Sequence, residues 1–225
     1  MARLQLLLAV SVIMLAAASG GARGFHFEEA TVDSIHRSFR NGSLTSAALL
    51  HAVIEVNPDA LRDVSRADAE RGVNRRAAAG GLHGVPVLIK DFIATRDRLN
   101  TTAGSFALLG SVARRDAGVV ARLRRAGVVV LGKSNLPEWG NFRNAAGLDG
   151  WSARGGQAMN PYVLVVDPCQ ASTGSAIAAA ANMAAVTLGT ETLASILCPA
   201  SVNSVVGIKP TVGLTSRSGV IPFHS

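Results

Sequence analysis

The chain has few aromatic and few charged residues for its length. Of its 225 residues, 4% are aromatic and 16% are charged, while 48% are hydrophobic. This balance excludes an intrinsically disordered chain and is sufficient for one hydrophobic core. The formal net charge is +7, but its arginines are dispersed and there are few aromatic rings on which bases could stack. We therefore expect a globular protein without a nucleic-acid partner.

Cysteine is also scarce. The two cysteines, Cys169 and Cys198, allow one disulfide at most and exclude a disulfide-rich scaffold. No histidine or cysteine spacing is typical of a metal site, and no motif accepted below requires a cofactor. We expect two buried thiols, no metal and no cofactor.

The first 24 residues have the order of a secretory signal peptide. Arg3 precedes an apolar run over residues 4–18, and small residues follow up to Gly24. The run is too short to favour a membrane span, so no stable membrane anchor is expected. We expect a mature portion over 25–225 in the secretory pathway or outside the cell, with acceptor sequons at Asn41 and Asn100.

Lysine is rare as well, since the chain has three lysines against nineteen arginines. One of them, Lys90, ends the apolar run 85–89. Burial can lower the pKa of a lysine until it is neutral, whereas arginine stays charged. If the run is a strand, Lys90 shares a face with Leu88, and Asp91 points to the opposite face. The segment alone leaves two interpretations, a neutral base or a strand-end lysine that reaches solvent.

Two segments rich in small residues contain candidate serine nucleophiles. Ser195 lies within GTETLASILCPAS at 189–201, and Ser172 lies within the turn ASTGS at 171–175. A serine hydroxyl needs a base within hydrogen-bond reach, directly or through one relay group. Together with Lys90, these segments are typical of a serine hydrolase that uses lysine in place of histidine.

The ordered set of motifs resembles the amidase signature family, in particular its plant and bacterial branch. The resemblance runs from about residue 27 to residue 223. Its segments are LHGVPVLIKD, TTAGS, LGKSN, GWSARGGQ, NPY, the serine turn, GTETLASILCPAS and VVGIKPTVGLTSRSGVIP.

The resemblance implies a catalytic role for three residues: Ser195 as nucleophile, Ser172 as bridging serine and Lys90 as base. It implies a hydrolase that cleaves the C–N bond of a small carboxamide substrate through an acyl-enzyme. Backbone N–H groups at residues 192–195 would hold the oxyanion, and the family has a cis peptide before its bridging serine. The oxyanion and substrate positions are then Thr192, Leu193, Ala194 and Ser105, for which a helix-capping role is the alternative.

The chain departs from the family pattern at both turns. Leu193 and Ala194 stand where the family usually has Asp-Gly or Gly-Gly, and Gln170 stands where glycine is usual. We expect Gln170 to have a negative φ, because a left-handed backbone favours glycine. Leu193 and the shortness of the chain relative to the family favour one alternative to an active amidase, a catalytically inactive remnant. A second alternative is a protein similar to an amidotransferase component, which the signal peptide disfavours.

The resemblance also implies an α/β fold in which a mixed β-sheet is layered with helices. The family domain is about twice as long, so we expect a fold truncated after the catalytic core, with a partner covering the exposed sheet edge. The pattern predicts helices over 65–79, 116–126 and 175–185 and a strand over 128–131. Asp116 is expected to cap the second helix, and Gly127 to end it.

Two other motifs suggest different functions. Residues 127–134 satisfy the phosphate-loop pattern G-x-x-x-x-G-K-[ST], with Lys133 on the phosphates. The four variable positions, however, are the strand itself, which argues against a nucleotide site. His83 or His224 could serve a conventional triad, but neither belongs to a serine-centred motif.

Four further motif residues are expected to have structural roles. Arg154 is expected to be an ion-pair partner that ties loops together, and Lys209 to anchor a turn. Trp139 and Trp151 are expected to pack in the core or between loops.

Overall fold

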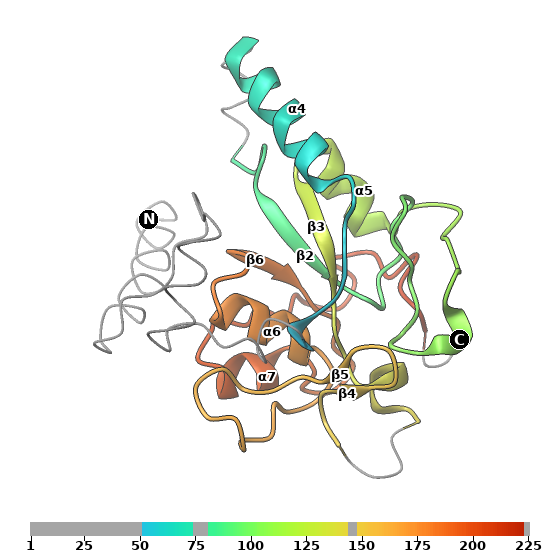
Figure 1. Cartoon of the computed structure of the whole chain (residues 1–225), viewed down its shortest axis with the longest axis vertical. Coiled ribbons are helices and arrows are strands. Elements are labelled where there is room, and N and C mark those ends of the chain that lie inside the picture. Colours follow the sequence, from blue (N-terminus) through green and yellow to red (C-terminus); the bar gives the residue numbers. More distant parts are fainter. Residues whose placement is uncertain (1–50, 74–80, 144–147, 223–225) are drawn as a thin grey trace.

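The computed structural model describes residues 51–73, 81–143 and 148–222. The predicted signal peptide, Asn41 and His224 therefore lie outside the described residues. The centre of the fold is a four-stranded sheet in the order β1-β3-β2-β6. β1 (Val53–Val56) is antiparallel to β3 (Val129–Ser134), while β2 (Pro86–Lys90) is parallel to both β3 and β6 (Val186–Leu188). The sheet is therefore mixed (Figure 1).

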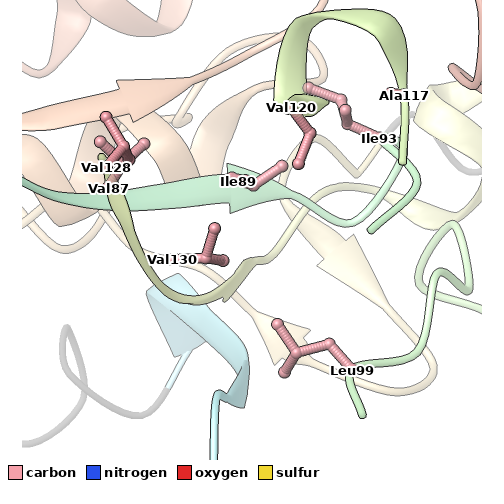
Figure 2. Close-up of a cluster of buried hydrophobic side chains, with 8 residues drawn as sticks. All are labelled: Val87, Ile89, Ile93, Leu99, Ala117, Val120, Val128 and Val130. Atoms are coloured by element: carbon pink, nitrogen blue, oxygen red, sulfur yellow. The ribbon is translucent and has the colours of Figure 1, made fainter. Parts of the chain in front are cut away.

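Strand β2 is buried on both faces of this sheet. Val87 and Ile89 pack into one apolar cluster, which Figure 2 shows between the sheet and the segment around Val120. Leu88 packs into a second cluster with Ile177 on the other face. The predicted alternation is confirmed, and it places the Lys90 side chain on the Leu88 face, toward the helix that contains Ile177.

Among the described residues, four α-helices pack around the sheet: α4 (Ala60–Val73), α5 (Gly118–Arg125), α6 (Thr173–Ala180) and α7 (Leu197–Val202). α6 contacts β2, β3, β6 and α7, and Figure 1 shows α6 and α7 together at the β6 side. The predicted helices are therefore present with shifted bounds. The predicted strand over 128–131 begins at Val129 and continues to Ser134.

The predicted cap of α5 is wrong. The N-cap residue is Ala117, with no side-chain cap. Asp116 instead accepts a hydrogen bond from the Arg96 N–H and pairs with Arg124 Nε at 3.2 Å, so tertiary contacts occupy its carboxylate. The predicted end is confirmed, because Gly127 follows the helix with a φ of 82°.

Shorter elements complete the fold. They are the 3₁₀ helices η1 (Phe106–Leu108) and η2 (Glu138–Asn141) and the two-stranded sheet of β4 (Trp151–Ser152) and β5 (Gly156–Gln157). Trp139 packs against a small cluster around Phe92, whereas Trp151 is exposed. In the part of the chain that is described, no helix is long and apolar enough to cross a membrane. The architecture is α/β, a mixed sheet layered with helices.

Candidate active site

Lys90 is the last residue of β2 and is 1% exposed. Burial lowers the pKa of Lys90 from 10.5 to about 7. The Lys90 Nζ also lies 5.5 Å from the centre of the Phe92 ring. A large fraction of this lysine is therefore neutral near pH 7, as a proton acceptor must be. The solvent-exposed alternative for Lys90 is wrong.

The carboxylate of Asp91 is directed away from Lys90. It accepts hydrogen bonds from the N–H groups of Thr102 and Gly104 and from the Thr102 hydroxyl. Burial raises the pKa of Asp91, and the contacts with Thr102 and Lys133 oppose that rise. Asp91 thus fixes the 102–104 loop, and burial alone accounts for the lowered pKa of Lys90.

Ser172 lies at the N-terminus of α6, next to Lys90 at the end of β2. Lys90 Nζ donates to Ser172 Oγ at 3.1 Å and to the Thr190 carbonyl at 3.4 Å. Ser172 Oγ donates to the Thr190 carbonyl at 3.0 Å and accepts from the Thr190 N–H at 3.2 Å. A Cβ at Gly189 would lie 2.7 Å from Ser172 Oγ. The strand end and the segment after β6 therefore enclose the Ser172 hydroxyl, and a side chain at Gly189 would displace it.

Ser195 lies in the segment that leads into α7 and is 9% exposed. Its backbone carbonyl accepts a hydrogen bond of 3.0 Å from the Ser172 N–H. Its Oγ donates instead to the Leu193 carbonyl at 3.3 Å. Among the hydrogen bonds of the described residues, none joins the two serine hydroxyls. The structure brings all three candidate residues together, with a Lys90–Ser172 bond but no Ser172–Ser195 side-chain bond.

The turn before Ser195 has the backbone shape for which glycine is suited. Ala194 has a φ of 56°, in the left-handed region. Leu193 is 78% exposed, and Thr192 is exposed as well. Among the described residues, no hydrogen bond uses the N–H groups at 192–195. Glu191, which sequence reasoning missed, accepts hydrogen bonds from the N–H groups of Ile196 and Leu197, the two residues after Ser195.

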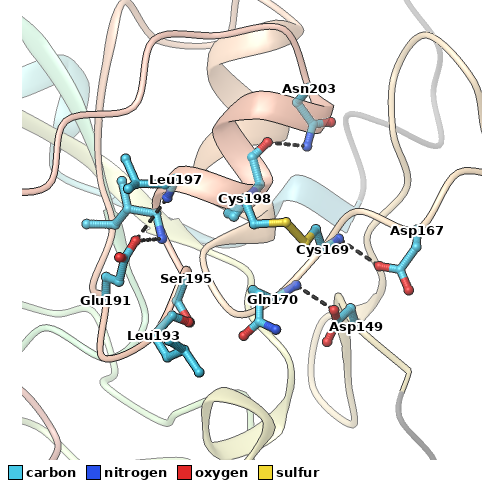
Figure 3. Close-up of a disulfide and its surroundings, with 12 residues drawn as sticks. Asp149, Asp167, Cys169, Gln170, Glu191, Leu193, Ser195, Leu197, Cys198 and Asn203 are labelled. Carbon is cyan, nitrogen blue, oxygen red and sulfur yellow. Dashed lines mark hydrogen bonds between the residues drawn. A yellow bond between two sulfur atoms is a disulfide. The ribbon is translucent and has the colours of Figure 1, made fainter.

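Three expectations about the turn before α6 are wrong. Gln170 has a φ of 56°, not a negative value, and the Ala171–Ser172 peptide is trans. Cys169 and Cys198 form a disulfide in place of two thiols (Figure 3). Two contacts hold Gln170 in the left-handed conformation. The Gln170 N–H donates to Asp149 at 2.5 Å, and the disulfide fixes the preceding residue, Cys169.

The remaining site residue, Ser105, has the capping role. It is the N-cap of η1, and its Oγ accepts from the Ala107 N–H at 3.4 Å. Arg154 forms the expected ion pairs, with Glu55 and with Asp91, and ties the β4–β5 turn to β1 and to the end of β2. Thr190 is a further site residue that sequence reasoning missed, since its carbonyl accepts hydrogen bonds from both Lys90 and Ser172. Its place five residues before Ser195 was the only signal.

The alternative motifs are not assembled as functional sites. Lys133 is buried inside the sheet, where burial lowers its pKa to about 8. Its Nζ donates to the Ile93 carbonyl at 2.5 Å and to Thr101 at 3.0 Å, so it serves no phosphate loop. His83 pairs with Glu70 on α4. Within the described ranges, no group of His, Cys, Asp and Glu could hold a metal ion.

Comparison with known proteins gives a consistent result. The family model described as Amidase matches residues 35–225. An Arabidopsis thaliana protein named as a probable amidase is 57% identical over 213 residues, which are 88% of this chain and 42% of the relative. A glutamyl-tRNA(Gln) amidotransferase component of Geobacter sulfurreducens is 44% identical over 180 residues, which are 78% of this chain and 35% of the relative.

Solved structures agree with the sequence matches. The native peptide amidase of Stenotrophomonas maltophilia is 47% identical with a TM-score of 0.73, over 88% of this chain and 43% of that one. An amidase family protein of Bacillus anthracis is 36% identical with a TM-score of 0.74, over 87% and 42%. The chain thus spans about two fifths of the length of these relatives. On sequence and fold alike, this chain belongs to the amidase signature family.

Proposed function

We propose that this chain is an amidase-type hydrolase that cleaves carboxamide C–N bonds through Ser195, Ser172 and Lys90. The observation that carries the proposal is the buried Lys90, with a pKa of about 7, bonded to Ser172 Oγ at 3.1 Å. A lysine that is buried and partly neutral beside a serine is poised to accept a proton. The Ser172 N–H bond to the Ser195 carbonyl keeps the two serines adjacent.

In this mechanism, protons move along the three side chains. Neutral Lys90 takes a proton from Ser172, and Ser172 takes one from Ser195 as the Ser195 oxygen attacks the amide carbonyl carbon. The step requires the Ser172 hydroxyl to turn from the Thr190 carbonyl, to which it donates at 3.0 Å, toward Lys90. It also requires Ser195 Oγ to leave the Leu193 carbonyl, which it now contacts at 3.3 Å, and to turn toward Ser172. A weak, long bond of this kind is a small obstacle to that rotation.

The N–H groups at residues 192–195 would stabilise the resulting oxyanion, with Thr192, Leu193 and Ala194 supplying donors before Ser195. The tetrahedral intermediate then breaks its C–N bond, and the proton held by the relay passes to the leaving nitrogen. Water hydrolyses the acyl-enzyme and restores Ser195.

A catalytically inactive protein is the second candidate, because Ser195 Oγ bonds to Leu193 and not to Ser172. Ala194 in a left-handed turn and the exposed Leu193 could misplace the oxyanion donors. A third candidate is a role similar to that of an amidotransferase component, supported by the 44% identity to the Geobacter sulfurreducens protein.

We also propose entry into the secretory pathway, on the basis of residues 1–24. Of the two sequons, Asn100 is already engaged, because its side-chain nitrogen donates to Glu55 at 2.8 Å. This contact occupies the nitrogen to which a glycan would be attached, which favours Asn41 as the acceptor. A polypeptide partner is proposed at β6, which is the last strand of the sheet and has Val186 exposed.

Covalent labelling tests the catalytic proposal. The purified chain is treated with a fluorophosphonate, and the modified residue is identified by mass spectrometry. We expect modification at Ser195, a rate that falls at least about a hundredfold in Lys90→Ala, and none in Ser195→Ala. Ser201→Ala, an exposed serine on α7, is the matched control and should label normally. An unmodified Ser195 in the folded protein would favour the inactive candidate.

A further inference from the structure

The disulfide lies between the two serine segments of the candidate site. Cys169 is three residues before Ser172, and Cys198 is three residues after Ser195. One sulfur therefore belongs to the turn that leads into α6, and the other to the first turn of α7. Figure 3 shows the bridge beside Ser195 and Gln170. A covalent link at this place joins the segment of the bridging serine to the segment of the nucleophile.

Both segments have backbone shapes that other contacts must hold. Cys169, Gln170 and Ala194 all have left-handed φ values, of 61°, 56° and 56°. For residues other than glycine, such conformations cost free energy and persist only where the surroundings fix them. The segments would therefore relax toward other conformations if their anchors were released.

The local anchors act within each segment separately. On the α6 side, Asp167 accepts from the Cys169 N–H and Asp149 from the Gln170 N–H. On the α7 side, Glu191 accepts from Ile196 and Leu197. The disulfide acts between the segments, in parallel with the Ser172 N–H bond to the Ser195 carbonyl and the two bonds of Ser172 Oγ to Thr190. It constrains the distance over which a proton would pass between the serines.

We propose that the Cys169–Cys198 disulfide is a positioning element of the site, which sets the acylation rate of Ser195 and makes it sensitive to thiol reductants. The inference rests on the proposed function. Both cysteines are half-buried, and the sequence contains no other cysteine, so a dithiol has one target in this chain. Reduction transfers two electrons and two protons from dithiothreitol to the bridge, giving two thiols and oxidised dithiothreitol.

Two measurements on the same samples test this inference. Hydrogen exchange of the Ser172 amide reports its bond to the Ser195 carbonyl, independently of catalysis. Fluorophosphonate labelling reports the reactivity of Ser195. Upon reduction, we expect at least about tenfold faster exchange of the Ser172 amide and at least about tenfold slower labelling of Ser195, both reversed by reoxidation. The double variant Cys169→Ser/Cys198→Ser should match the reduced protein and should not respond to dithiothreitol.

Each outcome decides the inference. Unchanged exchange of the Ser172 amide overturns it, since the disulfide then positions nothing at this bond. Faster exchange with unchanged labelling also overturns it, because the geometry would not matter to Ser195. If Ser195 is unlabelled in both states, the proposed function fails, and the exchange result alone shows whether the disulfide positions Ser172. Circular dichroism of the double variant separates these outcomes from general unfolding.

Discussion

Replacing Lys90 by methionine should stabilise the fold while abolishing the reactivity of Ser195. Methionine has a similar length but no charge, so it fills the site at the end of β2 without the cost of burying an ammonium group. Because burial lowers the pKa of Lys90 from 10.5 to about 7, this cost amounts to roughly 5 kcal/mol when the unfolded lysine is fully protonated. The variant also loses the hydrogen bond to Ser172, which offsets about 1 kcal/mol of the stability gained.

The pH dependence of the free energy of unfolding is a more specific test of the Lys90 pKa. Between about pH 7 and pH 10.5, the unfolded chain holds a proton on Lys90 that the folded protein has largely released. The free energy of unfolding of the natural chain therefore rises with pH over this window. From pH 7 to pH 9, we expect the natural chain to gain about 2 kcal/mol relative to Lys90→Met, which lacks this titration. Other groups, including Lys133, titrate in both proteins and cancel in the difference.

Urea denaturation of both proteins at pH 7, 8 and 9 measures this difference. Lys209→Met, at an exposed lysine away from the site, is the matched control for the loss of a lysine. A Lys90→Met difference that stayed within about 0.5 kcal/mol across the range would refute a neutral, buried lysine. The same samples should show no labelling of Ser195 in Lys90→Met.

Three further predictions concern the surroundings of the site. Ala194→Gly should stabilise the protein by up to ~1 kcal/mol in thermal unfolding, because glycine relieves the left-handed strain at a smaller entropic cost; a loss of stability would mean that the turn is not strained. Arg154→Met should cost about 3 kcal/mol in urea denaturation, because it removes the ion-pair partner of Glu55 and leaves Lys133 as the cation beside the buried Asp91; a cost under about 0.5 kcal/mol would contradict that role. His83→Gln should leave the labelling rate of Ser195 unchanged, since its ring pairs with α4; lost labelling would exclude Lys90 as the sole base.

The sequence predicted the α/β fold and several local features of it, and the reasons lie in local patterns. The alternation of β2 predicted which face Lys90 would occupy, because side chains of a strand alternate whatever the rest of the fold does. Gly127 predicted the end of α5 for an equally local reason, the left-handed φ that follows a helix. Asp116 failed as a cap because its carboxylate is used by the Arg96 N–H from another loop and by Arg124 from the last turn of α5.

What the sequence by itself determined is the family, the α/β class and the positions of Lys90, Ser172 and Ser195, since motifs and periodicity are properties of short segments. Tertiary structure alone decided the state of these groups. The lowered pKa of Lys90 comes from burial between β2 and α6, and the left-handed Gln170 and the Cys169–Cys198 bridge come from packing two distant segments together. The bond of Ser195 Oγ to Leu193 is likewise a property of the folded turn. Such features depend on neighbours far apart in the chain, whose distances no local pattern specifies.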